Sequence, residues 1–233
     1  MQNGFCNVPL AVVYALPHYG SELVNQLLYG EEVTVTDTPQ GLFCKVRGHY
    51  DGYEGWVQKT QVELANKKAG AALVQTAIAW DAALKMWLPM GSELQGAAND
   101  ATALPANESL LRGIVMQWLN APYLWGGRSV LGVDCSGFAQ VVFKMMGIAL
   151  PRDARQQVQL GTALNFLQEA KCGDLAFFDN EQGDIIHVGI LLNDAEIIHA
   201  AGKVRIDKID NAGIVNSSTG LRTHRLRIVK RYF

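Results

Sequence analysis

The sequence has 233 residues, with a hydrophobic fraction of 49%, a charged fraction of 18% and a formal net charge of −2. This composition is typical of a globular protein built from one large domain or two small ones. The near-zero charge gives no sign of binding to nucleic acid or to an anionic membrane, so neither is expected as a partner. No segment approaches the roughly 20 unbroken apolar residues of a transmembrane helix.

The N-terminus and the cysteines bear on the cellular compartment. The opening sequence MQNGFCNVPLAVVYALPHYG has no basic segment, and Pro9 and Pro17 bracket its apolar run, so we do not interpret it as a signal peptide. Four cysteines are present, without a C-x-x-C pair or a zinc-type cluster: Cys6, Cys44, Cys135 and Cys172. Two disulfides are compatible with this count. We favour free thiols, no metal or organic cofactor, and a cytoplasmic protein, or a periplasmic or extracellular one if a signal has been removed.

Residues 8–64 alternate short apolar runs with turn-forming residues. Three strands are predicted, over Glu32–Thr36, Leu42–Arg47 and Gly55–Gln58. A Pro-Gln-Gly turn and a His-Tyr-Asp-Gly turn separate them. Several short strands at close spacing indicate a small β-barrel.

The following segment is less regular. Residues 71–94 are apolar but are interrupted by Pro89 and Gly91, and we expect two more strands here, attached to the first domain. Residues 96–107 are small and polar, which is typical of a linker. We therefore expect an all-β domain with its linker over 1–105 and a second domain over 106–233.

Helices open the second domain. Apolar residues repeat at helical spacing from Leu110, with Asn107 as the N-cap and a stop at Pro122. A second apolar stripe begins at Phe138 and ends at a C-cap, Gly147. A third short helix is expected over 154–159, and the chain then continues as strands from Gly173 onward. Helices followed by strands indicate an α+β fold.

The stretch GVDCSGF places Cys135 at the start of the second predicted helix. The positive end of a helix dipole should lower the thiol pKa and favour a nucleophilic thiolate, although a small buried cysteine in a helical core is equally ordinary. Two histidines, His187 and His199, stand in consecutive apolar strands. They could serve as a base and its orienter, or as core histidines bonded to backbone carbonyls, and spacing alone leaves these alternatives about even.

Five motifs, YLWGG, DCSGF, GDLAFF, HVGI and IIHA, occur in an order that resembles the NlpC/P60 family of papain-like cysteine peptidases. The resemblance covers residues 108–233. It implies Cys135 as the nucleophile, His187 as the base and His199 as the orienter. It also implies that the Tyr123 hydroxyl supports the oxyanion.

The first domain resembles a bacterial SH3 (SH3b) domain through LLYGEEVTV and GYEGWV. SH3b followed by NlpC/P60 is similar to the γ-D-glutamyl-L-diamino acid endopeptidases, which cut murein peptides after D-Glu and require a free N-terminal L-Ala. The resemblance implies a monomeric thiol protease that acts through a thioester acyl-enzyme. An exported endopeptidase acting on intact peptidoglycan and a non-catalytic wall-binding module are the alternatives.

A free substrate amine requires anions and hydrogen-bond acceptors around it. The resemblance assigns the amine to five residues of both domains: Asp134, Ser136, Asp153, Tyr53 and Glu22. Each also has an ordinary interpretation, such as a helix-terminal charge for Asp153 or barrel core for Tyr53. Trp125 is expected to wall the substrate cleft. The family often has serine where Ala154 stands and proline where Cys172 stands.

Other aromatic and basic residues receive simpler interpretations. We expect His18, His49 and His224 on the surface, and Trp80 and Trp87 in a core. The alternating basic and apolar residues at 225–233 predict a half-exposed edge strand.

Overall fold

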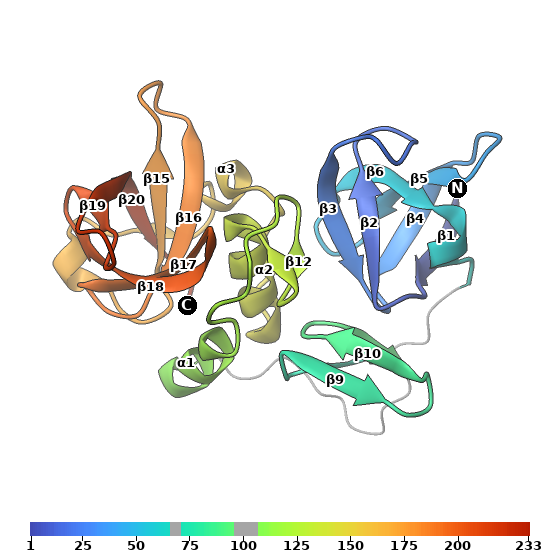
Figure 1. Cartoon of the computed structure of the whole chain (residues 1–233), viewed down its shortest axis with the longest axis horizontal. Helices are drawn as coiled ribbons and strands as arrows, with labels where there is room; N and C mark the ends of the chain where they lie inside the picture. Colours follow the sequence, from blue (N-terminus) through green and yellow to red (C-terminus); the bar gives the residue numbers. More distant parts are fainter. Residues whose placement is uncertain (66–70, 96–106) are drawn as a thin grey trace.

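Two β-sheets, one from each end of the chain, flank a central helix, α2 (Cys135–Met145) (Figure 1). The computed structural model describes residues 1–65, 71–95 and 107–233. The expected boundary between residues 105 and 106 lies outside the described residues and stays a prediction. The expected α+β class is confirmed, because an all-β N-terminal part precedes a part that combines helices with a second sheet.

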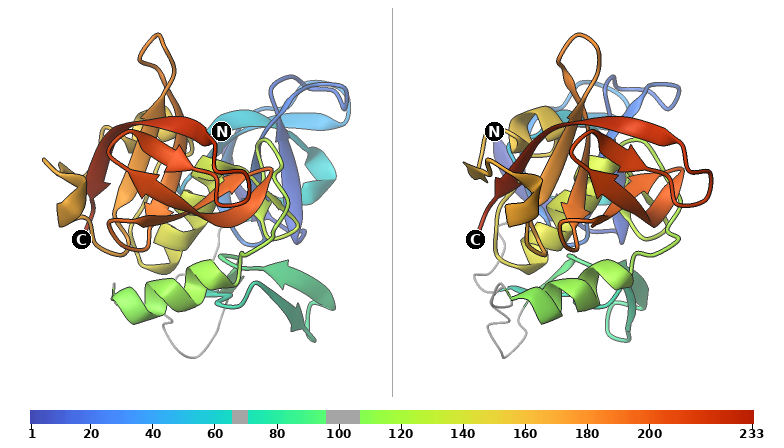
Figure 2. Two further views of the ribbon diagram at one scale, coloured as in Figure 1. Left: turned by 60° about the vertical axis from the view of Figure 1, so that its left-hand side comes forward. Right: turned by 90° about the vertical axis from the view of Figure 1, so that its left-hand side faces the viewer.

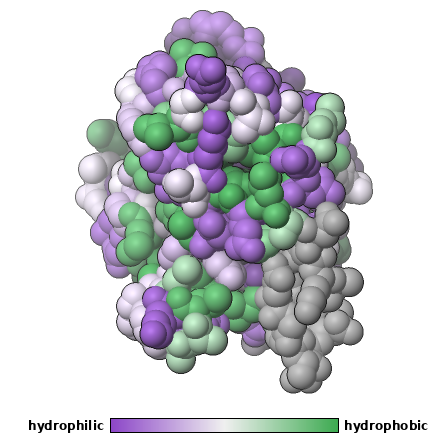
Figure 3. Space-filling model, turned by 90° about the vertical axis from the view of Figure 1, so that its right-hand side faces the viewer, coloured by the Kyte–Doolittle hydropathy of each residue, from purple (hydrophilic) through white to green (hydrophobic). Residues whose placement is uncertain are grey.

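The N-terminal sheet has seven antiparallel strands in the order β3-β2-β6-β5-β4-β1-β7. Its strands are β1 (Gln2–Cys6), β2 (Leu10–Tyr14), β3 (Leu23–Leu28), β4 (Glu32–Asp37), β5 (Phe43–Gly48), β6 (Glu54–Gln58) and β7 (Val62–Glu63). The three predicted strands are β4, β5 and β6. Alternate residues point inward, so that Val33, Val35 and Val46 are buried in the barrel core. The face of the molecule on the side of this barrel carries hydrophilic and hydrophobic residues side by side (Figure 3).

The segment after the barrel differs from the prediction. It forms four strands, not two: β8 (Ala71–Leu73) pairs with β11 (Glu93–Gln95), and β9 (Ile78–Asp81) pairs with β10 (Met86–Pro89). It bridges both domains, because the Glu93 N–H donates to the Tyr29 carbonyl while Met90 packs in the C-terminal core.

We expected Trp80 and Trp87 in a core, but both side chains are exposed. They lie opposite each other on β9 and β10, with ring centroids 5.4 Å apart, and are 51% and 57% exposed. The reason is architectural: these two strands form a sheet of their own, paired with no other strand of the described chain.

The predicted helices are present. The Asn107 side chain caps α1 (Glu108–Met116), accepting a hydrogen bond from Leu110 N at 2.9 Å. The apolar stripe of α1 is buried, and both views of Figure 2 place the helix beside β9 and β10. Gly147 follows α2 in a left-handed conformation (φ 73°). The third helix, α3 (Ala154–Gln157), is shorter than expected.

The C-terminal sheet follows the order β14-β20-β15-β16-β17-β18-β19, and β19 pairs back to β20. Its strands are β14 (Thr162–Ala163), β15 (Leu175–Asp179), β16 (Ile185–Leu191), β17 (Glu196–Ala201), β18 (Lys203–Asp210), β19 (Gly213–Val215) and β20 (Arg222–Arg231). Six strands thereby close into a barrel, with α2 packed on β16 and β17. The edge-strand prediction for 225–233 is wrong, because β20 pairs with β14, β15 and β19.

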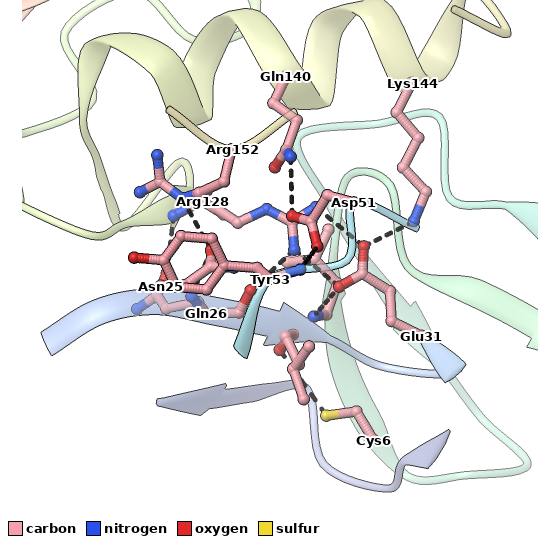
Figure 4. Close-up of polar contacts among 12 residues, drawn as sticks. Cys6, Asn25, Gln26, Glu31, Asp51, Tyr53, Arg128, Gln140, Lys144 and Arg152 are labelled. Carbon is pink, nitrogen blue, oxygen red and sulfur yellow. Dashed lines mark hydrogen bonds and ion pairs between the residues drawn. The ribbon is translucent and has the colours of Figure 1, made fainter. Parts of the chain in front are cut away.

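The contact between the two domains is polar and buried (Figure 4). Glu31 of the SH3b barrel accepts hydrogen bonds from Arg128 at 2.7 and 2.9 Å and from Lys144 at 2.8 Å, and all three side chains are at most 5% exposed. The Arg152 Nε donates to Asn25 Oδ1 at 2.8 Å. Burial alone would raise the pKa of Glu31, but Arg128 and Lys144 lower this pKa to about 2.

Candidate active site

The loop before α2 sets the position of Cys135. Asp134 is the N-cap of α2, and its Oδ1 accepts a hydrogen bond from Gly137 N at 2.7 Å. Gly137 lies against the preceding loop, where a Cβ would be 2.3 Å from the Gly127 carbonyl oxygen. Cys135 is therefore the first residue of a helix whose start is held against its own approach loop.

The Cys135 thiol is neutral in the resting structure. Burial and the adjacent Asp134 carboxylate raise the pKa of Cys135 to about 11, although the backbone N–H groups of Val188 and Ser136 and the guanidinium of Arg152 act in the opposite direction. The expectation of a depressed pKa is wrong, because desolvation outweighs the helix dipole. A base must therefore take the thiol proton during attack.

His187 on β16 and His199 on β17 form a hydrogen-bonded pair, with His187 Nε2 and His199 Nδ1 2.8 Å apart. Both rings are buried. The Cys135 thiol contacts the backbone N–H of Val188, the residue after His187, so the nucleophile lies beside the strand that carries the base. Because Nε2 of His187 is occupied, Nδ1 is the ring nitrogen left to receive a proton. Burial, His199 and His224 hold the pKa of His187 well below its usual value.

An acid that the sequence analysis did not predict extends this pair of histidines. Asp207 on β18 places Oδ2 3.1 Å from His199 Nε2, and its side chain is 1% exposed. The signal in the sequence was an acid within VRIDKI, a predicted strand that alternates apolar and charged residues. Its significance depends on β18 pairing with β17, which local periodicity does not reveal.

His224, which we expected on the surface, is half-buried and faces the base. It lies on β20 and stacks on His187, with ring centroids 4.2 Å apart and an interplanar angle of 26°. Burial and His199 lower the pKa of His224 to about 4. Closure of β20 onto β15 and β19 brings this ring to the base.

Tyr123 is 36% exposed and lies close enough to the nucleophile to sense its charge. Burial, Cys135 and Asp134 raise the pKa of Tyr123 to about 12. The phenol therefore keeps its proton and can donate a hydrogen bond to an oxyanion. This geometry is compatible with the oxyanion role, which stays a prediction.

A cleft of about 520 Å³ runs between the two domains. It brings together seven residues of the predicted site: Glu22, Tyr53, Trp125, Asp134, Cys135, Ser136 and Asp153. His187, His199 and Tyr123 are not among the residues that line it. Residues of both domains thus share one cavity with the nucleophile.

Two of the seven residues, Asp134 and Ser136, interact with Arg152. The Asp134 carboxylate is 4% exposed, forms an ion pair with Arg152 and accepts hydrogen bonds from Gly126 N and Gly137 N. Ser136 Oγ accepts from Arg152 at 2.8 Å. Arg152 thus pairs with both side chains in the resting structure. The amine-binding role expected of Asp134 and Ser136, which both line the cleft, stays a prediction.

The other acids of the cleft are available. Asp153 precedes α3 without a side-chain cap hydrogen bond, and it is exposed. Burial and then Asp153 are the main causes that raise the pKa of Tyr53, to which Glu22 also contributes, so the three residues form one group. Trp125 is 59% exposed and donates from Nε1 to Glu22 Oε1 at 2.7 Å. Trp125 therefore walls the cleft and does not fill the core.

Known proteins match both parts of this chain. Residues 120–223 match the NlpC/P60 family, and residues 13–62 match the bacterial dipeptidyl-peptidase Sh3 domain. A γ-D-glutamyl-L-lysine dipeptidyl-peptidase of Bacillus subtilis is 31% identical over 75% of this chain and 71% of its own length. The chain belongs to the NlpC/P60 family. It is accordingly a cysteine peptidase.

Two further proteins are similar to this chain over most of its length. A γ-D-glutamyl-L-lysine dipeptidyl-peptidase of Bacillus cereus is 28% identical over 88% of this chain and 76% of its own length. The crystal structure of an NlpC/P60 family protein from Bacillus cereus superposes over 99% of both chains with a TM-score of 0.84 and 22% identity, which shows a shared fold.

No helix within residues 1–65, 71–95 and 107–233 is long and apolar enough to cross a bilayer. In the same residues, no group of three or more His, Cys, Asp or Glu side chains is arranged to hold a metal ion. All four cysteines are free thiols.

Proposed function

We propose that this peptidase hydrolyses the bond between γ-D-Glu and the diamino acid of cell-wall peptides that carry a free N-terminal L-Ala. The observation that carries the proposal is the shared cleft, in which Asp153, Tyr53 and Glu22 lie in the same cavity as Cys135. Two relatives that match 88% and 75% of this chain are named γ-D-glutamyl-L-lysine dipeptidyl-peptidases. We propose that the enzyme acts as a monomer.

The proposed reaction starts from a neutral Cys135 thiol and a neutral His187 ring. As the Cys135 sulfur attacks the γ-carbonyl carbon, its proton moves to Nδ1 of His187, and the oxyanion is stabilised by hydrogen bonds, one of them from Tyr123. The protonated His187 then gives the proton to the leaving amine, which leaves a thioester on Cys135. Water activated by His187 hydrolyses the thioester and restores the thiol.

The remaining acids account for amine selectivity. Asp153 and Glu22 are exposed in the cleft, and among the described residues the Asp153 carboxylate has no hydrogen-bond or ion-pair partner. A substrate ammonium supplies the missing positive charge. Acetylation removes that charge and adds bulk, so the cleft should reject the acetylated peptide.

The test measures kcat/KM for L-Ala-γ-D-Glu-L-Lys and for its N-acetylated form, on the wild type and on Asp153→Asn. Removing one partner of a desolvated ion pair costs about 3–5 kcal/mol, or roughly 100- to several-thousand-fold in kcat/KM. We expect the wild type to favour the free amine by such a factor and Asp153→Asn to narrow the gap. Asp194→Asn, an exposed acid outside the cleft, should change neither value.

The other outcomes identify the alternatives. Equal cleavage of the two peptides by the wild type would support an endopeptidase of intact peptidoglycan, which has no use for a free amine. Turnover of neither peptide, together with binding of wall fragments, would support a non-catalytic module.

A further inference from the structure

Asp207 is surrounded by hydrogen-bond donors. Its Oδ1 accepts from Arg205 Nη2 at 2.9 Å and from Ser217 N at 2.8 Å, while Arg205 Nε lies 2.9 Å from Oδ2. The remaining neighbour of Oδ2 is Nε2 of His199. Arginine and backbone N–H groups can only donate, so the carboxylate has no opportunity to act as anything but an acceptor.

This fixed acceptor determines where the protons of two imidazoles lie. A hydrogen bond to Asp207 requires the proton of neutral His199 to be on Nε2, which makes its Nδ1 an acceptor. The 2.8 Å contact then requires the proton of His187 to be on Nε2. His187 Nδ1 is consequently unprotonated, and it is the nitrogen left for the thiol proton.

We propose that Asp207 is a positioning residue that sets the tautomer of the base His187 through His199. This inference rests on the proposed role of Cys135 and His187. It extends the hydrogen-bonded pair of His187 and His199 by a third group, Asp207, on the far side of His199 from His187. Asp207 touches neither substrate nor thiol and acts only through the intervening ring.

The charged and titratable neighbours agree with this assignment. His187 is contacted by His199 from β17 and by His224 from β20. Burial opposes ionisation of Asp207, but hydrogen bonds from His199, Ser217 and Arg205 more than offset it and hold the Asp207 pKa far below its usual value. The acceptor therefore persists over the whole range in which His187 is neutral.

The variant Asp207→Asn should reverse the order of protons. At Oδ1 an amide NH2 would meet two obligate donors, whereas His199 can become an acceptor by changing tautomer. The amide therefore donates to His199 Nε2, His199 donates from Nδ1 to His187, and the His187 proton moves to Nδ1. A protonated Nδ1 cannot accept the thiol proton.

Activity and tautomer are measured separately. We expect Asp207→Asn to lower kcat by about 10²- to 10⁴-fold, the range seen when a triad acid is replaced by its amide, with KM almost unchanged. Asp210→Asn, an exposed acid on the same strand, removes the same charge and should keep full activity. In a His199→Ala background, Asp207→Asn should cost nothing further.

The tautomers are read by ¹⁵N NMR of histidine-labelled protein at a pH where both rings are neutral. The wild type should show His187 and His199 protonated at Nε2, and Asp207→Asn should show both at Nδ1. Wild-type His199 protonated at Nδ1, or a variant with unchanged tautomers and full kcat, would overturn the proposal. A wild type that has the expected tautomers but leaves the peptide intact would refute the proposed substrate and not the role of Asp207.

Discussion

The thiol of Cys135 and the ring of His187 show how strongly burial governs individual residues. Burial raises the pKa of the thiol and lowers the pKa of the imidazole, so both groups are neutral at pH 7. The resting site is therefore a neutral pair, and charge separates only when the sulfur attacks. This state avoids a buried ion pair in the free enzyme.

The stacked ring of His224 gives a prediction for stability against pH. Its pKa of about 4 is below the usual value of 6.5, mainly through burial. Between these values the unfolded chain binds a proton that the native protein does not, so the unfolding free energy should decrease as the pH falls from about 6.5 to about 4.

Urea unfolding of the wild type and of His224→Phe across this window checks the prediction. Phenylalanine keeps the stack on His187 and removes the titration, so the variant should lose less stability on acidification. His18→Phe, at an exposed turn, should follow the wild-type curve. An unchanged slope in His224→Phe would show that this ring does not contribute to the acid sensitivity.

At the scale of elements, the start of α2 depends on a close approach of two backbone segments. Gly137 has no room for a Cβ beside the Gly127 carbonyl, whereas a Cβ on Gly113 in α1 would meet nothing within 4 Å. The two helical glycines therefore predict opposite effects of the same substitution.

Gly113→Ala should stabilise the protein by about 0.5–1 kcal/mol, since alanine is the better helix former. Gly137→Ala should destabilise it by about 1–3 kcal/mol through overpacking, and should lower kcat because the loop beside Cys135 must move. Denaturant unfolding and peptide hydrolysis measure both effects. If Gly137→Ala were as stable and active as the wild type, the close approach would not constrain the site.

The elements also show what a sequence can predict. The α1 and α2 stripes, the N-cap Asn107 and the strands around His187 and His199 follow from local periodicity. Local periodicity does not predict the residues that long-range strand pairing brings to the site. Asp207 and His224 become part of the site only because β18 and β20 close the barrel. The short strand β19, which completes this closure, has too few residues for a periodic signal.

At the scale of the whole molecule, the SH3b barrel and the peptidase domain share one buried set of ions. Glu31 neutralises Arg128 and Lys144, and Asn25 holds Arg152, which in turn holds Asp134 at the start of α2. The barrel therefore supports the nucleophile as well as one wall of the cleft.

Because of this coupling, Glu31→Gln should lower both the unfolding free energy and the activity. The buried Arg128 loses its counter-ion and Lys144 retains only Glu93, which should cost about 3–5 kcal/mol of unfolding free energy. Activity toward the free-amine peptide should fall as the cleft loosens. Glu54→Gln, which breaks an exposed ion pair on the same barrel, should change unfolding little. Unfolding curves and kcat/KM for both variants test this, and equal stability of the two would contradict the coupling.

The buried ions also limit how such proteins can be recombined. An SH3b barrel that binds its neighbour through an apolar patch could be replaced by another barrel with a similar patch. Here, a replacement barrel must present a carboxylate at the position of Glu31, because the buried Arg128 would otherwise have no counter-ion and Lys144 would retain only Glu93. The two domains are therefore interchangeable only as a matched pair, and chimeras between family members should fold when both sides of this interface come from the same parent.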